Sequence, residues 1–426
     1  MFSTGRGRNT RAQVREEALS LGRKHRPDYW IVVICALLLA VGIIVVYAIG
    51  PALKITTNLS ASYYTSRQII AVILSAIAFI FTATIPIKRW KENTKWILWI
   101  AIIATALAVV LPVNPAYPAH RWVRLGSISF QSVELLKFGA VLWLTAFLTK
   151  AVKNNTITDF KKTFKPILII ILISGVIIAG IQSDLGSMAV LLAMLGVMAF
   201  VAGLPIKKIM TIIGFVLIGL ILAIIIFPYR IARIEAYLHP SSSNNCQNAS
   251  DYQACQALIA VGSGGMFGLG LGHSVQAYGY EPEAANDSIF AIYAETFGFV
   301  GSIVLVGLFW ILFNRFKIIA ENLDDVYAKL LVIGVLTWLS VQTIINIGAM
   351  IGLLPLKGIT LPFVSYGGTS IVFSAAAVGL VFQLSRYTNY QGNSLKSVKD
   401  RRISGENRLN GRRVGGSYNS DSSNSH

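Results

Sequence analysis

Five ionisable side chains lie within or beside long apolar runs of this sequence, where charged groups are costly. Glu134 and Lys137 lie early in one run and are three residues apart, so a helix places them on one face. Asp184 lies between two runs, Asp287 directly precedes another, and Glu295 lies about two turns into that run. Ionisable groups at such depths usually face the interior of a helix bundle. We predict a polar cavity that brings carboxylates near a lysine; helix packing alone is the alternative for the Glu134–Lys137 pair and for Glu295.

The elements that must position these residues are membrane-spanning helices. Of the 426 residues, 54% are hydrophobic and 13% are charged, whereas about 25% of a soluble domain is charged. The apolar runs are about twenty residues long and do not alternate, which favours helices over a membrane barrel. The ten runs are Trp30–Ile49, Ile69–Ile87, Trp96–Val113, Ser132–Thr149, Ile167–Ile181, Leu185–Val201, Ile206–Phe227, Ile289–Phe313, Leu330–Ile351 and Ser370–Arg386.

The positions of the basic residues orient these runs. With the N-terminus in the cytoplasm, 29 of the 37 Lys and Arg residues fall in inside segments, 7 fall outside, and Lys137 lies within a span. This bias is the positive-inside pattern, which an odd number of spans would blur. We predict an all-α polytopic membrane bundle of about ten helices with both termini in the cytoplasm. The outer leaflet side carries one large loop, residues 228–288, between spans seven and eight.

The chain thus divides into three parts. Residues 1–28 form a basic cytoplasmic tail without the apolar core of a cleavable signal peptide. Residues 29–387 form the membrane domain. Residues 388–426 are rich in Ser, Asn, Gly and Arg and are predicted to be disordered. The net charge of +18 indicates contact with anionic lipid headgroups. Nucleic-acid binding is not expected, because no aromatic residues interleave the basic runs.

Four arginines stand outside against the orientation bias. They are Arg121, Arg124, Arg230 and Arg233. Arginine suits bidentate contacts with phosphate, so a ligand role is one interpretation; headgroup contact or a surface salt bridge is the other.

The outside segments hold further features. Residues 352–368 break helices yet stay apolar, which indicates a loop that dips into the membrane where protein buries it. Residues 262–272 are rich in glycine, a pattern more typical of turns than of a phosphate cradle, and they lack the P-loop lysine. Cys246 and Cys255 both lie in the large outside loop, where an oxidising compartment favours a disulfide; two free thiols are the alternative.

Four separated stretches resemble the SEDS family of shape, elongation, division and sporulation proteins, which includes FtsW, RodA and SpoVE. They are Arg121-Trp122 with LGSISFQSVELLK, QSDLG from Gln182, the Gly-rich stretch through PEAANDSIFAIYAE, and NIGAMIGLLPLKGITLPFVSYGGTS from Asn346. The run GLGLGHSVQ looks more like the division branch than the elongation branch. The sequence has Ala285 and Asn286 where the family usually has His-Thr.

The resemblance implies a peptidoglycan glycosyltransferase that polymerises lipid II at the outer leaflet of the cytoplasmic membrane, at the division septum if the division branch is correct. It places the family's essential acid on Asp287 and its polar pair on Glu134 and Lys137. We predict that Asp287 is the general base and that Lys137 holds it ionised. We also predict that Glu134, Lys137, Asp184 and the four arginines contact substrate.

No residue set has metal-ligand spacing, and a divalent cation (Mg²⁺ or Mn²⁺) between Asp287 and the pyrophosphate is the one cofactor that this mechanism admits. The resemblance implies a class B penicillin-binding protein and division regulators as partners. Two other functions remain open: a lipid II flippase, which needs polar residues through the cytoplasmic half as well, and a non-enzymatic division scaffold. Reconstituted polymerisation distinguishes them.

Overall fold

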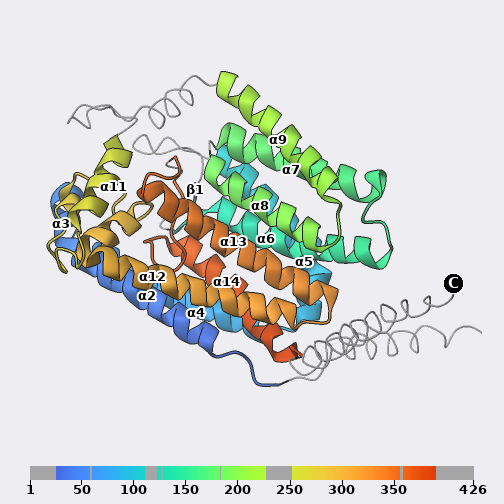
Figure 1. The fold of residues 1–426 in the computed structure, drawn as a ribbon, viewed down its shortest axis with the longest axis horizontal. Helices are drawn as coiled ribbons and strands as arrows, with labels where there is room; N and C mark the ends of the chain where they lie inside the picture. Colours follow the sequence, from blue (N-terminus) through green and yellow to red (C-terminus); the bar gives the residue numbers. More distant parts are fainter. Residues whose placement is uncertain are drawn as a thin grey trace, which may run out of the picture.

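A computed structural model describes residues 25–57, 60–110, 122–125, 128–182, 184–226, 252–355 and 358–389. Long helices lie alongside one another in a bundle, with short elements at its ends (Figure 1). The bundle helices are α2 (Trp30–Ala48), α4 (Tyr63–Thr84), α5 (Ile87–Val110), α6 (Ser132–Lys153), α7 (Lys165–Ser174) continued by the π-helix η2 (Gly175–Ile181), α8 (Leu185–Val201), α9 (Ile206–Ile226), α12 (Ile289–Glu321), α13 (Val326–Met350) and α14 (Gly368–Leu384).

Each of the ten predicted spans falls on one of these helices. In the described part of the chain, seven helices are long and apolar enough to cross a membrane: α2, α4, α5, α6, α12, α13 and α14. The other three predicted spans fall on α7 with η2, on the 17-residue apolar helix α8, and on α9. The polytopic helix bundle is therefore confirmed. α12 continues to Glu321, eight residues beyond the predicted end of its span, because the helix persists past the apolar run.

The described chain begins and ends at the same end of the bundle. The backbone N–H of His25 donates to the carbonyl oxygen of Arg386 (2.8 Å), and that of Asp28 donates to the hydroxyl of Ser385 (3.0 Å). Asp28 also pairs with Arg315 near the end of α12 (3.9 Å). Contact between the two ends requires an even number of crossings, which agrees with ten. The cytoplasmic sidedness of this end rests on the charge pattern.

Shorter elements lie at the other end. They are α3 (Gly50–Thr57), α11 (Tyr252–Ser263), the 3₁₀ turn η3 (Gln276–Tyr278) and an antiparallel hairpin of β1 (Trp122–Leu125) and β2 (Ile128–Gln131). The hairpin departs from the all-α prediction. Its signal is present in the sequence, since Gly126 and Ser127 separate two short runs with β-branched and aromatic residues. The cytoplasmic end also has the short helices η1 (Phe160–Phe164) and η4 (Ser385–Tyr387).

The loop between α13 and α14 enters the bundle, as its apolar composition predicts. Val364 is fully buried. The α2 helix packs directly on it, because Gly42 has no side chain: a Cβ there would lie 2.5 Å from the carbonyl oxygen of Val364. Phe363 adopts a left-handed backbone conformation (φ 65°), an unfavourable state for a bulky residue that the surrounding contacts must hold. This loop between α13 and α14, the re-entrant loop, forms the frame of the candidate site together with α13.

Candidate active site

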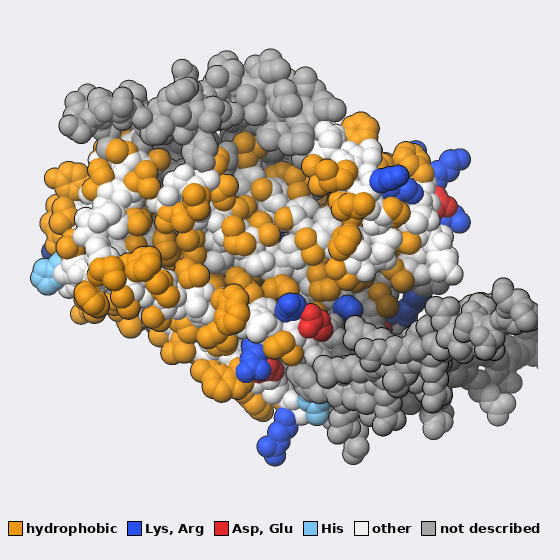
Figure 2. All heavy atoms as spheres, viewed as in Figure 1, with side chains coloured by type: hydrophobic (Ala, Val, Ile, Leu, Met, Phe, Trp, Pro, Cys, Tyr) orange, Lys and Arg blue, Asp and Glu red, His pale blue; other side chains and the backbone are white. Residues whose placement is uncertain are grey.

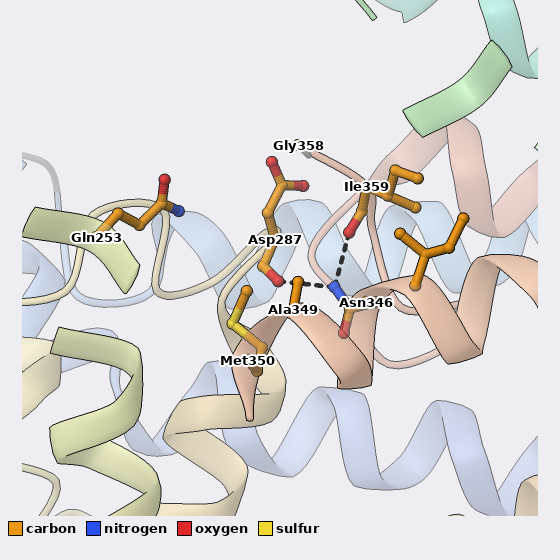
Figure 3. A pocket seen from close by; sticks show the side chains of 8 residues that line it. Gln253, Asp287, Asn346, Ala349, Met350, Gly358 and Ile359 are labelled. Atoms are coloured by element: carbon orange, nitrogen blue, oxygen red, sulfur yellow. Dashed lines mark hydrogen bonds between the residues drawn. The ribbon is translucent and has the colours of Figure 1, made fainter. Parts of the chain in front are cut away.

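Asp287 lies at the entry to α12, at the end of the bundle opposite the described chain ends. Its side chain is partly exposed and borders a small hollow whose other lining residues are Gln253, Ile345, Asn346, Ala349, Met350, Gly358 and Ile359. The Asp287 carboxylate points away from Asn346, whereas its backbone carbonyl faces that residue (Figure 3). A carboxylate displayed from a fixed backbone can receive a proton from a bound hydroxyl.

Asn346 of α13 fixes that backbone. Its amide nitrogen donates to the carbonyl oxygen of Asp287 (2.7 Å) and to the carbonyl oxygen of Ile359 (2.7 Å). The Asn346 side chain is 2% exposed, so these bonds form in a medium where losing them is costly. One amide therefore ties the entry of α12 to the re-entrant loop (Figure 3).

Glu134 and Lys137 form a buried ion pair on α6, as their spacing predicts. The Lys137 ammonium donates to Glu134 Oε1 (2.8 Å) and to Gln342 Oε1 on α13 (2.7 Å), and it lies 5.3 Å from the centre of the Trp338 ring. The side chains of Lys137 and Glu134 are 1% and 3% exposed. The hydrogen bonds of the Lys137 ammonium thus go to Glu134 and Gln342, and the expectation that Lys137 holds Asp287 ionised stays a prediction.

The two polar centres are connected through α13. Gln342 and Asn346 are one helical turn apart, so they lie on the same face. Gln342 accepts from Lys137 and donates through its amide to the carbonyl oxygen of Thr360 (3.0 Å), next to the Ile359 carbonyl that Asn346 holds. Lys137 thus reaches Asp287 by way of two amides and the re-entrant loop.

Sequence reasoning missed Gln342 and Asn346. Two amide side chains spaced four residues apart in an apolar span were the available signal, because buried amides need hydrogen-bond partners. A further tie was not visible in the sequence: the Tyr366 N–H of the re-entrant loop donates to the Ala285 carbonyl oxygen (2.8 Å), two residues before Asp287.

Comparison with known proteins gives the family of the chain. The FtsW/RodA/SpoVE cell cycle protein family model matches residues 29–390. The chain belongs to this family. It is 35% identical over 366 residues to a probable peptidoglycan glycosyltransferase FtsW of Coxiella burnetii, covering 85% of this chain and 96% of that protein. It is 35% identical over 369 residues to stage V sporulation protein E of Bacillus subtilis, covering 86% and 99%.

Solved structures share the fold. A chain from a peptidoglycan synthase complex, studied for its coordination of polymerisation and crosslinking, aligns with a TM-score of 0.67 and 23% identity. The alignment covers 86% of this chain and 99% of that one. The membrane bundle of this FtsW/RodA/SpoVE-family chain therefore has a fold that is known from solved structures.

Asp184 has a local structural function in this family member. It is the N-cap of α8: Oδ1 accepts from the Ser187 N–H (2.9 Å) and Oδ2 from the Ser187 hydroxyl (2.8 Å). A carboxylate at this position satisfies free helix N–H groups and complements the helix dipole. The side chain is 2% exposed. These bonds explain its burial without a ligand, and its contact with substrate stays a prediction.

Glu295 also has a structural explanation. Its fully buried carboxylate accepts from the Ser274 hydroxyl and from the N–H groups of Val275 (3.0 Å) and Gln276 (3.3 Å). It therefore fixes the outer loop onto α12, which agrees with the packing alternative. The glycine-rich residues 262–272 likewise pack against α12 and form turns.

Only one of the four predicted arginines belongs to the described part of the chain. Arg121, Arg230 and Arg233 lie outside the described residues, as do the two tails and much of the large loop. Arg124 stands on β1, paired with Ser129 of β2, but its side chain is not described. Their contacts with a phosphate group stay predictions.

The described residues include two of the three cysteines and Asp287, the carboxylate predicted to hold a divalent cation. Cys255 on α11 is disulfide-bonded and Cys35 is free; Cys246 lies outside the described residues. Among the described residues, no group of three His, Cys, Asp or Glu side chains could hold a metal ion. Mg²⁺ often binds through one or two carboxylates and completes its shell with substrate phosphates and water, so a divalent cation at Asp287 stays a prediction.

Proposed function

We propose that this chain is a peptidoglycan glycosyltransferase that polymerises lipid II on the outer face of the cytoplasmic membrane during cell division. A relative that is 35% identical over most of its length is named a probable peptidoglycan glycosyltransferase FtsW, and another is named stage V sporulation protein E. The observation that carries the proposal is Asp287: a partly exposed carboxylate on a backbone fixed by Asn346, at the outer end of a membrane bundle.

The height of Asp287 suits a lipid-linked sugar. Helix α12 starts two residues after it, and Ile289 lies roughly 9 Å along the helix from Glu295 at 1.5 Å per residue. Arg315 lies 16 residues beyond Phe299, the first residue after the departure from helical geometry at Gly298, which is roughly 24 Å of a hydrocarbon core about 30 Å thick, and Asp287 lies a further twelve residues before Phe299. Asp287 therefore lies beyond the acyl chains, at the level where the diphosphate and sugar of lipid II are expected.

The reaction forms one bond and breaks one. A sugar hydroxyl of the acceptor attacks the anomeric carbon of the donor, its proton passes to the Asp287 carboxylate, and the C–O bond to the undecaprenyl pyrophosphate breaks. Direct displacement inverts the anomeric centre. Arg121, Arg124, Arg230 and Arg233 would neutralise the leaving diphosphate. A bound Mg²⁺ or Mn²⁺ would add positive charge at the same place, with Asp287 as a ligand.

In this proposal the buried pair of Glu134 and Lys137 acts through the helices and the loop that position Asp287. Lys137 holds Gln342, and Gln342 and Asn346 hold the re-entrant loop and the entry to α12. Their contribution is to keep the Asp287 carboxylate in one place, which matters because small displacements of reacting groups cost large factors in rate.

The distribution of charge favours the enzyme over the flippase. The embedded ionisable groups of the described spans are Glu134, Lys137 and Glu295, and all three lie toward the outer end. In the described spans, the charged residues of the inner half lie only near the helix ends. A polar path across the whole membrane is therefore not formed by these side chains.

The partner is proposed on the same basis. A class B penicillin-binding protein, which crosslinks new strands, is expected to work with this chain, and the solved neighbour belongs to a complex that coordinates polymerisation with crosslinking. Division regulators are proposed as further partners, and the division septum is proposed as the location of the chain.

The test is reconstitution of the purified chain in vesicles with fluorescent lipid II. The enzyme converts lipid II that already lies in the leaflet facing the active site into glycan polymer. A flippase would move lipid II between leaflets without making polymer, and a scaffold would do neither; either result contradicts the proposal. Because a partner is expected, the same assay includes the chain mixed with a class B penicillin-binding protein.

A further inference from the structure

The second half of the large outer loop has a composition unlike that of an aqueous loop. Residues 252–280 contain no Asp, Glu, Lys or Arg. Several apolar side chains of this stretch are exposed, and the most exposed is Phe267 at 80%. The others are Leu258, Ile259, Met266, Leu269, Leu271, Val275, Tyr278 and Tyr280. A contiguous exposed apolar stretch indicates contact with something other than water.

This stretch pairs with α12 by backbone hydrogen bonds. The α12 backbone departs from helical geometry at Gly298 (φ 68°, ψ −165°), which frees hydrogen-bonding groups. The N–H groups of Phe299 and Val300 donate to the carbonyls of Gly265 (2.9 Å) and Met266 (3.1 Å). The approach is so close that a Cβ on Gly298 would lie 2.3 Å from the nitrogen of Gly268. The loop residues thus replace partners that the helix has lost.

The pairing continues along α12 toward its start. The N–H groups of Leu269 and Gly270 donate to the carbonyl oxygens of Glu295 (2.9 Å) and Thr296 (3.0 Å). Residues 265–270 therefore lie beside residues 295–300 of α12, and their height in the membrane follows from that helix.

Arg315 provides the reference for depth. It lies at the end of the bundle where the described chain begins and ends, with Asp28 at 3.9 Å and the Trp30 ring at 5.9 Å. Val300 precedes Arg315 by 15 residues, which is roughly 22 Å along a helix. The hydrocarbon core is about 30 Å thick. Any tilt of α12 shortens the vertical distance, so Met266 and Phe267 lie within the outer part of the hydrocarbon core.

The exposed apolar stretch is continuous with the lipid-facing side of α12. Phe299, Ile303, Val304 and Trp310 of that helix are all more than half exposed, as expected for side chains in contact with acyl chains. Hydrophobic side chains extend from the side of the bundle onto the end where α11 and α3 lie (Figures 1 and 2).

We propose that residues 264–272 form a membrane-dipping segment of the outer leaflet. Met266, Phe267, Leu269 and Leu271 contact lipid acyl chains. Two observations favour lipid: the continuity with α12 and the absence of charge from residue 252 to residue 280. The proposal follows from the membrane bundle and does not depend on the glycosyltransferase activity.

The segment also anchors the loop that presents Asp287. Directly after it, Ser274, Val275 and Gln276 are bonded to the buried carboxylate of Glu295. The chain from η3 to the entry of α12 is therefore attached at the membrane surface. Anchoring in the leaflet sets the height of the Asp287 loop relative to a lipid-linked substrate.

Spin-label accessibility in vesicles tests the placement. One cysteine is introduced at a time in a Cys35→Ala background, and the Cys35→Ala parent treated with the same spin label measures any signal from Cys246 and Cys255. The variants are Phe267→Cys, a lipid reference Ile303→Cys on α12, and a water reference Glu92→Cys, whose side chain is 60% exposed at the start of α5. Each label is probed by collision with oxygen, which enters the bilayer, and with a polar nickel complex, which does not.

The label at position 267 is expected to match that at position 303, with nickel collision lower than at position 92 on the order of tenfold, since polar groups partition poorly into hydrocarbon. Nickel accessibility equal to that at position 92 places the segment in water and overturns the proposal. Protection from both oxygen and nickel shows protein packed on Phe267, such as a second copy, and also overturns it. The three sites are surface-exposed, so the variants are expected to fold.

Discussion

The side-chain amide of Asn346 donates to the backbone carbonyl oxygen of Asp287 at 2.7 Å, although 59 residues separate the two in the chain. The same nitrogen holds the carbonyl oxygen of Ile359. These two hydrogen bonds fix the backbone that carries the Asp287 carboxylate and do not involve the carboxylate itself. The proposed catalytic group and its positioning group are thus separate residues on separate helices.

Asn346→Asp is expected to reduce lipid II polymerisation by roughly 10- to 100-fold, because small displacements of a reacting group cost factors of that size. The substituted carboxylate has a similar shape but no N–H to donate to either carbonyl. The initial rate of polymerisation and the unfolding temperature are both measured for the variant, which distinguishes misplacement of Asp287 from unfolding of the protein. The control is Ser340→Ala, a partly exposed residue of the same helix. Equal rates for Asn346→Asp and wild type would contradict the positioning function.

Lys137→Met is expected to destabilise the protein by roughly 3–5 kcal/mol, because it leaves Glu134 buried without its cation. The double variant Lys137→Met/Glu134→Leu removes both charges and is expected to recover most of that loss. Unfolding of the wild type, both single variants and the double variant in one detergent gives the coupling energy. Additive losses would show that the pair is not a coupled buried unit.

Much of this architecture follows from the sequence, and the reasons are physical. Span number and orientation depend on apolar length and the placement of Lys and Arg, which are local properties. The Glu134–Lys137 pair follows from helical spacing. The connection from Lys137 to Gln342 spans 205 residues of chain, and no local pattern specifies which helix faces which. Lys137 and Asp287 contact different amides of α13, Gln342 and Asn346, and this arrangement was not visible in the sequence for the same reason.

The glycine-rich stretch shows the same limit. Its composition indicated turns, and its contacts show why glycine is needed: a Cβ on Gly264 would lie 2.1 Å from the Ala294 carbonyl oxygen, and one on Gly268 would lie 2.2 Å from that of Thr296. The partner surface is the broken part of α12 around Gly298, a break that composition alone did not reveal.

The stability of the Asp287 loop is expected to depend on pH through Glu281. This carboxyl is 4% exposed, and burial raises its pKa from 4.5 to about 8; the Ser288 hydroxyl opposes the shift and the Glu295 charge adds to it. Between pH 4.5 and 8 the folded protein holds a proton that the unfolded chain has released, so the free energy of unfolding falls as pH rises through this window. Below pH 4.5 and above pH 8, Glu281 does not contribute to the pH dependence of the free energy of unfolding.

Glu281→Gln removes that proton equilibrium. The variant is expected to gain stability relative to the wild type as pH rises from about 5 to 8, with the difference constant above 8 and at most about 5 kcal/mol at 1.36 kcal/mol per pKa unit. Unfolding temperatures of both proteins across this range provide the measurement. Glu283→Gln, an exposed carboxyl of the same loop, is the control and is expected to parallel the wild type. Parallel curves for Glu281→Gln as well would contradict the buried, protonated state.

Gly42→Ala is expected to destabilise the protein by about 1–3 kcal/mol, the usual cost of overpacking. The added methyl group would lie 2.5 Å from the Val364 carbonyl oxygen, so α2 or the re-entrant loop must shift. Gly196→Ala in α8 is the matched control, since nothing lies within 4 Å of its new Cβ; a gain of about 0.5–1 kcal/mol is expected from helix propensity. Equal effects of the two substitutions would show that α2 does not pack on the loop backbone.

The most direct test of the proposed function is polymerisation of lipid II by purified Asp287→Asn protein. The substitution keeps the size of the side chain and the bond from Asn346 to the backbone carbonyl, and it removes only the group that accepts a proton. A loss of about 100- to 10,000-fold in rate is expected, the usual contribution of a general base. Glu283→Gln, which neutralises a carboxyl four residues away, is expected to retain activity. Wild-type rates for Asp287→Asn would contradict the assignment of Asp287 as the base.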